Sequence, residues 1–186
     1  MTEIVCILDR SGSMHSLQTE VIGSFNSFVE EQRRLLKDRS NTLTLVLFDD
    51  KYEMVYERVP LEFVPKLTSS TYFTRGMTSL FDAIGKTVNS INPDKSKVLV
   101  LIQTDGQENS SKEYKSDQVK ELIKSKERFG WQFNFVGAGP EAFEQGQHFN
   151  GVISSANQMY TTNTARGMRE GFNFMNNQSV AYCNSR

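Results

Sequence analysis

The chain has 186 residues and a formal net charge of -1, with 38% hydrophobic and 23% charged residues. This length fits a single domain, residues 1–186, with a sizeable buried core, and the composition excludes a disordered chain. The near-neutral charge gives no electrostatic reason to expect nucleic acid or an anionic membrane as a partner.

The two cysteines, Cys6 and Cys183, are too few for a disulfide framework or a zinc site. The N-terminus does not resemble a signal peptide, and no apolar run approaches the roughly 20 residues that a membrane helix needs. We therefore expect a soluble, cytoplasmic protein.

Strand and helix patterns alternate along the first half of the chain. An unbroken apolar run at 4–8 predicts a central strand of a parallel sheet, because both faces of such a strand must be covered. Apolar residues at helical spacing predict a helix over 21–36. A second buried strand is predicted at 43–48, and the alternating segment 52–59 predicts an antiparallel edge strand. The stretch 60–76 predicts loop.

The second half continues this alternation. In chain order, we expect a helix at 80–91 followed by Pro93, a buried strand at 97–102, a helix at 116–129 closed by Gly130, parallel strands at 131–136 and 151–154, and a last helix whose apolar stripe is Ala165, Met168, Phe172 and Met175. Strands that alternate with helices predict an α/β fold with a doubly wound, mostly parallel sheet, one antiparallel edge strand and helices on both faces. Ligands of such sheets bind beyond the carboxyl ends of the strands.

Side chains with oxygen atoms gather in three loops at that edge. Asp9, Ser11 and Ser13 directly follow the first strand, Thr78 precedes a helix, and Asp105 follows the strand at 97–102. Alternate positions of an extended loop point the same way, so the first three side chains can face a common centre. Mg2+ binds six oxygen ligands and keeps several waters. Because serine and threonine hydroxyls are neutral, an ion held by them keeps charge that attracts a carboxylate from another molecule.

This arrangement resembles a von Willebrand factor A (vWA) domain with a metal-ion-dependent adhesion site (MIDAS), written Asp-x-Ser-x-Ser, then Thr, then Asp. The matching positions, in that order, are Asp9, Ser11, Ser13, Thr78 and Asp105. The resemblance covers nearly the whole chain. It implies that the three hydroxyls bind the metal directly and that the two aspartates act through water, although the family switches between arrangements in which Thr or Asp coordinates directly. It also implies Mg2+, with Mn2+ or Ca2+ as substitutes, and a Glu or Asp of a partner protein at the sixth position.

Standalone domains of this size resemble prokaryotic or phage-encoded members of the family, including those linked to tellurium resistance and those that serve AAA+ ATPases. An adaptor of that kind is one alternative function. The resemblance further suggests that partner binding reshapes the metal loops and shifts the last helix, expected at about 157–177.

A hydrolase that uses the metal to activate water is the other alternative. The chain has two histidines, no Gly-x-Ser-x-Gly elbow and no Asp-x-Asp motif, and no base is evident beside Ser11 or Ser13. We therefore predict a binding module and not an enzyme. The segment 137–142 is a weak dinucleotide pattern, because it follows a late strand and has no acidic residue about 20 positions on, so we expect no nucleotide.

The sequence allows more than one role for the residues around the predicted metal site. The plain alternative for the run 9–13 is a polar turn that caps a helix. We expect His15 to be a rim residue and Asn109 to cap a turn. Four residues are open between lining the rim and packing beneath it: Met14, Tyr72, Phe73 and Arg75.

Overall fold

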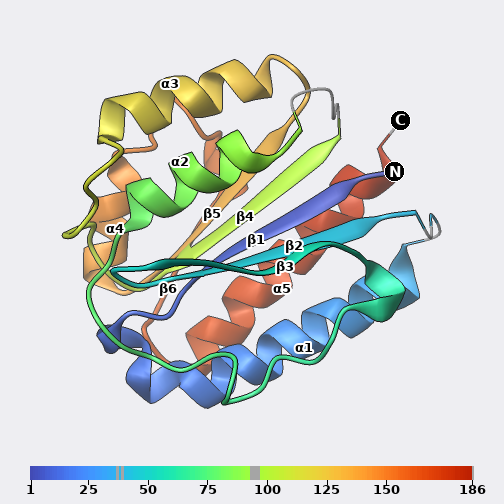
Figure 1. Cartoon of the computed structure of the whole chain (residues 1–186), viewed down its shortest axis with the longest axis horizontal. Helices are drawn as coiled ribbons and strands as arrows, with labels where there is room; N and C mark the ends of the chain where they lie inside the picture. Colours follow the sequence, from blue (N-terminus) through green and yellow to red (C-terminus); the bar gives the residue numbers. More distant parts are fainter. Residues whose placement is uncertain (37, 39, 93–96, 186) are drawn as a thin grey trace.

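The computed structural model describes residues 1–36, 38, 40–92 and 97–185. Its six-stranded sheet has the order β3-β2-β1-β4-β5-β6 (Figure 1). The strands are β1 (Glu3–Asp9), β2 (Thr42–Phe48), β3 (Tyr52–Pro60), β4 (Val98–Thr104), β5 (Gln132–Ala138) and β6 (Gln158–Thr161). Strand β3 pairs antiparallel with β2, and every other pairing is parallel. The predicted fold class is confirmed.

Helices cover both faces of this sheet. They are α1 (Gln18–Leu35), α2 (Leu80–Ser90), α3 (Ser116–Glu127), α4 (Pro140–Gln147) and α5 (Ala165–Asn184), with short 3-10 helices η1 (Gly12–Leu17), η2 (Leu61–Phe63) and η3 (Ser155–Asn157). Helices α1 and α5 lie on one face, and α2 and α3 lie on the other (Figure 1). No helix in the described part of the chain is long and apolar enough to cross a bilayer.

Strand β1 lies in the middle of the sheet, where it pairs with β2 on one side and β4 on the other. Ile4, Cys6 and Leu8 join the core that includes α1 and α5 residues, whereas Val5 and Ile7 join the core that includes α2 and α3 residues. This double burial explains why the strand is an unbroken apolar run. Burial also raises the pKa of the Cys6 thiol, which forms no disulfide.

The predicted strand at 151–154 is wrong. Val152 and Ile153 are buried, but they lie in a turn after α4 in which only a single bridge joins Asn150 and Ile153. The sixth strand is β6 instead, and its sequence Gln-Met-Tyr-Thr has no apolar run.

Two expectations about helices also need correction. The last helix begins at Ala165 and runs to Asn184, whereas 157–177 was expected, and Ala165 is exposed while Met168, Phe172 and Met175 are buried. Helix α3 ends at Glu127, so Phe129 lies beyond it and is 67% exposed. Pro93 lies outside the described residues.

Candidate metal centre

The five predicted metal-site residues come together at the carboxyl edge of β1 and β4. These strands run parallel with Leu8 opposite Gln103, so the loops after Asp9 and Thr104 leave the sheet side by side. The Ser11 and Ser13 hydroxyl oxygens are 3.1 Å apart, and the Ser13 hydroxyl donates to Asp105 Oδ1 at 2.6 Å. Two of the three predicted segments are therefore in direct contact.

Thr78 completes the group from the segment before α2. A Cβ atom built on Gly106 would lie 3.5 Å from Thr78 Oγ1 and 3.8 Å from Ser13 Oγ. The Thr78 and Ser13 hydroxyls therefore face the same small space beside Gly106. A larger residue in place of Gly106 would narrow this space.

The donor set suits a hard cation. Metal–oxygen bonds of 2.0–2.1 Å in an octahedron place neighbouring ligands about 2.9 Å apart, close to the 3.1 Å between the Ser11 and Ser13 hydroxyl oxygens. Among the described residues, no group of three or more His, Cys, Asp or Glu side chains could hold a metal ion. A metal at this edge would therefore depend on the hydroxyls, and its binding remains a prediction.

Asp9 is fully buried, and both of its carboxylate oxygens are engaged. Oδ1 accepts the Ser11 backbone N–H at 2.7 Å, and Oδ2 accepts the Thr104 hydroxyl at 2.5 Å. Burial raises the pKa of Asp9 to about 6, against the opposing effect of these hydrogen bonds, and the charge of Asp105 raises it further. The Asp9 carboxylate, held by these two hydrogen bonds, orients the loop that follows β1. This is compatible with the expectation that Asp9 contacts the metal through a water molecule.

Asp105 is also buried, and its second oxygen has a partner that the sequence analysis missed. Asn163 Nδ2 donates to Asp105 Oδ2 at 3.2 Å from the loop after β6. Burial raises the pKa of Asp105, and the hydrogen bonds from Ser13 and Asn163 oppose the shift. The signal for Asn163 is its position at the carboxyl end of a parallel strand, which was not assigned correctly. Thr104 was missed as well, although it directly precedes Asp105.

The backbone of Thr78 is fixed by the loop after β4. Its N–H donates to Asn109 Oδ1 at 2.9 Å, and its carbonyl accepts the N–H groups of Asn109 at 3.0 Å and Ser110 at 3.2 Å. The Asn109 side chain therefore bonds to the backbone of another segment, whereas we expected it to cap a turn. These contacts fix the backbone of Thr78 and so limit the positions that its hydroxyl can take.

The rim residues divide according to burial. Met14 and Tyr72 are fully buried packing residues, and the Tyr72 hydroxyl donates to the Asp9 carbonyl at 2.6 Å. Phe73 and Arg75 are each 38% exposed. His15 is exposed, and its Nδ1 atom lies 3.2 Å from Thr74 Oγ1.

The raised pKa of Asp9 predicts how metal binding depends on pH. Without metal, the folded chain holds the Asp9 proton more tightly than the unfolded chain, so this group's contribution to stability is present below about pH 4 and is lost as the pH rises through about 6. A cation must displace that proton, so we expect the affinity for Mg2+ to be level above about pH 7 and to fall roughly tenfold per unit below about pH 6. Calorimetric titration with Mg2+ from pH 5 to 8 measures this, and an affinity that does not change over this range would contradict it.

Comparison with known proteins identifies the fold. No family model and no curated protein sequence matches the chain. Three similar solved structures are proximal thread matrix protein 1 from the mussel byssus (TM-score 0.70, 15% identity, 98% of this chain and 46% of that one), a von Willebrand factor type A protein from Catenulispora acidiphila (0.66, 16%, 96% and 42%) and BatB from Bacteroides thetaiotaomicron (0.60, 14%, 97% and 99%). The chain thus spans less than half of the first two and nearly all of the third. Another structure of the mussel protein, matched with a TM-score of 0.71 and 14% identity over 96% of this chain and 46% of that one, is described with a zinc-occupied MIDAS motif. At these identities, the comparisons show that the chain has the fold of vWA domains.

Proposed function

We propose that this chain is a divalent-metal-dependent protein-binding module, whose ion, Mg2+ in the first place, completes its coordination with a Glu or Asp of a partner protein. The observation that carries the proposal is the convergence of Ser11, Ser13 and Thr78 with two buried aspartates at one edge of the sheet. The vWA fold supports it, because the same edge is where ligands of such sheets bind.

The partner's chemistry follows from the charges of this donor set. Ser11, Ser13 and Thr78 would hold the ion through neutral hydroxyls, while Asp9 and Asp105 are tied to Thr104, Ser11, Ser13 and Asn163 by hydrogen bonds. When bound, the ion supplies positive charge and a coordination position for an outside ligand. A carboxylate meets both requirements, since Mg2+ prefers oxygen and the ion is not neutralised by its direct ligands.

The contacts of the two serines support binding without catalysis. Among the hydrogen bonds of the described residues, neither hydroxyl has a histidine partner, and His15 contacts Thr74 instead. The Ser13 hydroxyl donates instead to the Asp105 carboxylate, which is not the histidine base of a Ser–His pair. The proposed module therefore includes no chemical step.

Thr78→Ala tests the proposal with little risk to the fold, because the backbone contacts of Thr78 do not involve its hydroxyl. We expect the immobilised wild-type chain to retain a partner from an extract of its source in Mg2+ and to release it in EDTA. Thr78→Ala should retain at least tenfold less of the same partner in Mg2+, an effect in the range that loss of a metal-site interaction produces.

Ser16→Ala is the matched control, because Ser16 is an exposed hydroxyl residue in the same η1 segment as Ser13. It should behave like the wild type. Retention of the same partner in EDTA and by Thr78→Ala would overturn the proposed function. Calorimetric titration of the wild type with Mg2+ and with Mn2+ gives a second reading that needs no partner.

A further inference from the structure

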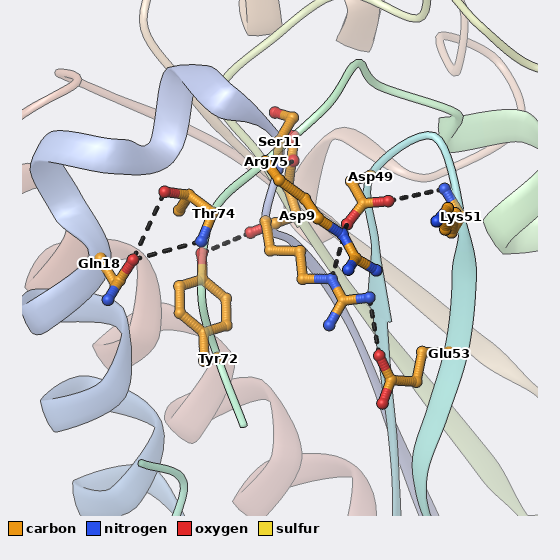
Figure 2. A network of polar contacts seen from close by, with 10 residues as sticks. Asp9, Ser11, Gln18, Asp49, Lys51, Glu53, Tyr72, Thr74 and Arg75 are labelled. Carbon is orange, nitrogen blue, oxygen red and sulfur yellow. Dashed lines mark hydrogen bonds and ion pairs between the residues drawn. The ribbon is translucent and has the colours of Figure 1, made fainter. Parts of the chain in front are cut away.

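An ion cluster of Arg10, Asp49 and Arg75 lies beside the metal centre. Arg10, between Asp9 and Ser11 in sequence, is fully buried, and its Nε donates to Asp49 Oδ2 at 2.9 Å. Arg75 Nε donates to the same oxygen at 2.8 Å (Figure 2). One buried carboxylate therefore joins a side chain from the first metal loop to a side chain from the Thr78 segment.

The surroundings of Asp49 fix its orientation. Its other oxygen, Oδ1, accepts the Lys51 backbone N–H at 2.7 Å (Figure 2). The Glu53 carboxylate lies 2.7 Å from Nη2 of Arg10. The Phe73 ring packs against both arginines, with its centroid 5.3 Å from the Arg10 guanidinium carbon and 5.0 Å from that of Arg75. Both guanidinium groups are thus held by charge and by an aromatic face.

Backbone hydrogen bonds follow the same connection. The Arg75 N–H donates to the Arg10 carbonyl at 2.9 Å, and the Gly12 N–H donates to the Gly76 carbonyl at 3.1 Å. The Ser79 N–H donates to the Asp49 carbonyl at 2.9 Å. The segment 75–79 is therefore pinned on both sides of Thr78, to the Ser11 loop and to the end of β2.

We propose that Arg75 is a positioning residue for the metal centre: by pairing with Asp49, it holds the Thr78 hydroxyl in register with those of Ser11 and Ser13. This inference rests on the proposed function, since it concerns the same metal site. Asp49 is the shared anchor, and removal of Arg75 leaves it paired with Arg10. The Arg75 side chain is 38% exposed, whereas that of Arg10 is fully buried, so Arg75 is the arginine whose replacement disturbs the core less.

If Arg75 acted through its charge alone, its replacement would change the affinity for Mg2+ in the opposite direction from a loss of positioning. Removing the positive charge of Arg75 near a cation site would strengthen the binding of Mg2+ if electrostatic repulsion were its main effect. Loss of the positioning contact weakens binding instead, by about 10- to 100-fold for groups that orient metal ligands. The sign of the change in affinity therefore separates the two effects.

The test is calorimetric titration of Arg75→Gln and Arg75→Lys with Mg2+, together with hydrogen exchange of the metal-free proteins. We expect Arg75→Gln to bind Mg2+ about 10- to 100-fold more weakly and to exchange faster at the 75–79 amides. Arg75→Lys keeps the charge but lacks the planar Nε donor, so it should also bind more weakly. Arg166→Gln, which removes an exposed arginine that pairs along α5 with Glu170, should match the wild type.

Each result has a distinct meaning. Binding by Arg75→Gln that equals or exceeds the wild type would overturn the positioning role and leave the proposed function intact. Weaker binding without faster exchange at 75–79 would also overturn it, because the segment would then not depend on Arg75. Failure of the wild type to bind Mg2+ or Mn2+ would instead refute the proposed function and this inference with it. Should Arg75→Gln not fold, Arg75→Lys decides the question, because weaker binding with the charge kept supports the positioning role and unchanged binding overturns it.

Discussion

The Asp9→Asn variant is expected to be more stable than the wild type without metal and to lose most of the stabilisation that Mg2+ provides. Burial raises the pKa of Asp9 to about 6 from 3.8, so the ionised carboxylate destabilises the metal-free fold at neutral pH, by on the order of 3 kcal/mol. Asparagine has no charge and nearly the same shape. Its Oδ1 atom can still accept the Ser11 N–H, and its amide can donate to the Thr104 hydroxyl, so both contacts are kept.

Addition of metal should remove most of the difference in stability between the two proteins. Mg2+ at 100 times its dissociation constant raises the unfolding free energy of the wild type by about 2.7 kcal/mol. The variant should gain little, because it lacks the charge that balances the ion. Urea unfolding at pH 7.5 with Mg2+ and with EDTA measures both effects. Asp117→Asn, at a 95% exposed aspartate, is the control and should change neither value. An Asp9→Asn variant that is less stable in EDTA, or that gains as much from Mg2+, would contradict this account.

Gly167→Ala is expected to lower the unfolding free energy by about 2–3 kcal/mol, the upper range for overpacking a buried site. A Cβ atom at this position would lie 2.0 Å from the Thr162 carbonyl oxygen and 2.8 Å from the Thr162 hydroxyl oxygen. A backbone carbonyl cannot turn aside as a side-chain end can, so the loop before α5 must move. That loop carries Asn163, which bonds to Asp105, and the variant should therefore bind Mg2+ more weakly as well.

Gly23→Ala is the matched control, because it makes the same change in another helix where nothing lies within 4 Å of the added atom. Alanine is favoured over glycine in a helix by about 0.5–1 kcal/mol, so this variant should be more stable than the wild type by about that amount. Urea unfolding of both variants gives the comparison. Equal stabilities for Gly167→Ala and the wild type would show that the loop before α5 yields freely.

β3 could be predicted from the alternating pattern of an edge strand, and the other strands that could be predicted are those whose two faces are both buried. β1, β2, β4 and β5 are apolar runs for this reason, and their positions follow directly. β6 could not be found in this way, because it is a short edge strand whose four residues are all partly exposed. The apolar pair Val152 and Ile153 misled the assignment because a turn can bury two residues as completely as a strand does.

The candidate site was predictable to the extent that its residues follow strand ends. Asp9 is the last residue of β1 and Asp105 directly follows β4, so the topology alone brings their loops together. Asp49 directly follows β2 and Asn163 lies just after β6, but their roles depend on contacts between segments 26 to 58 positions apart, which no sequence pattern reveals. A fully buried arginine such as Arg10 also runs against the usual preference of charged residues for the surface.

Because Cys6 lies in the central strand, the rate at which its thiol is alkylated measures how often the core opens. The Cys6 thiol is buried in the core between the sheet and helices α1 and α5, so it can react with an alkylating reagent only while this core is open. Cys183 lies half-buried near the end of α5, where fraying of a helix terminus exposes it much sooner. The two thiols thus report on separate events: Cys183 on fraying at the end of α5, and Cys6 on opening of the core.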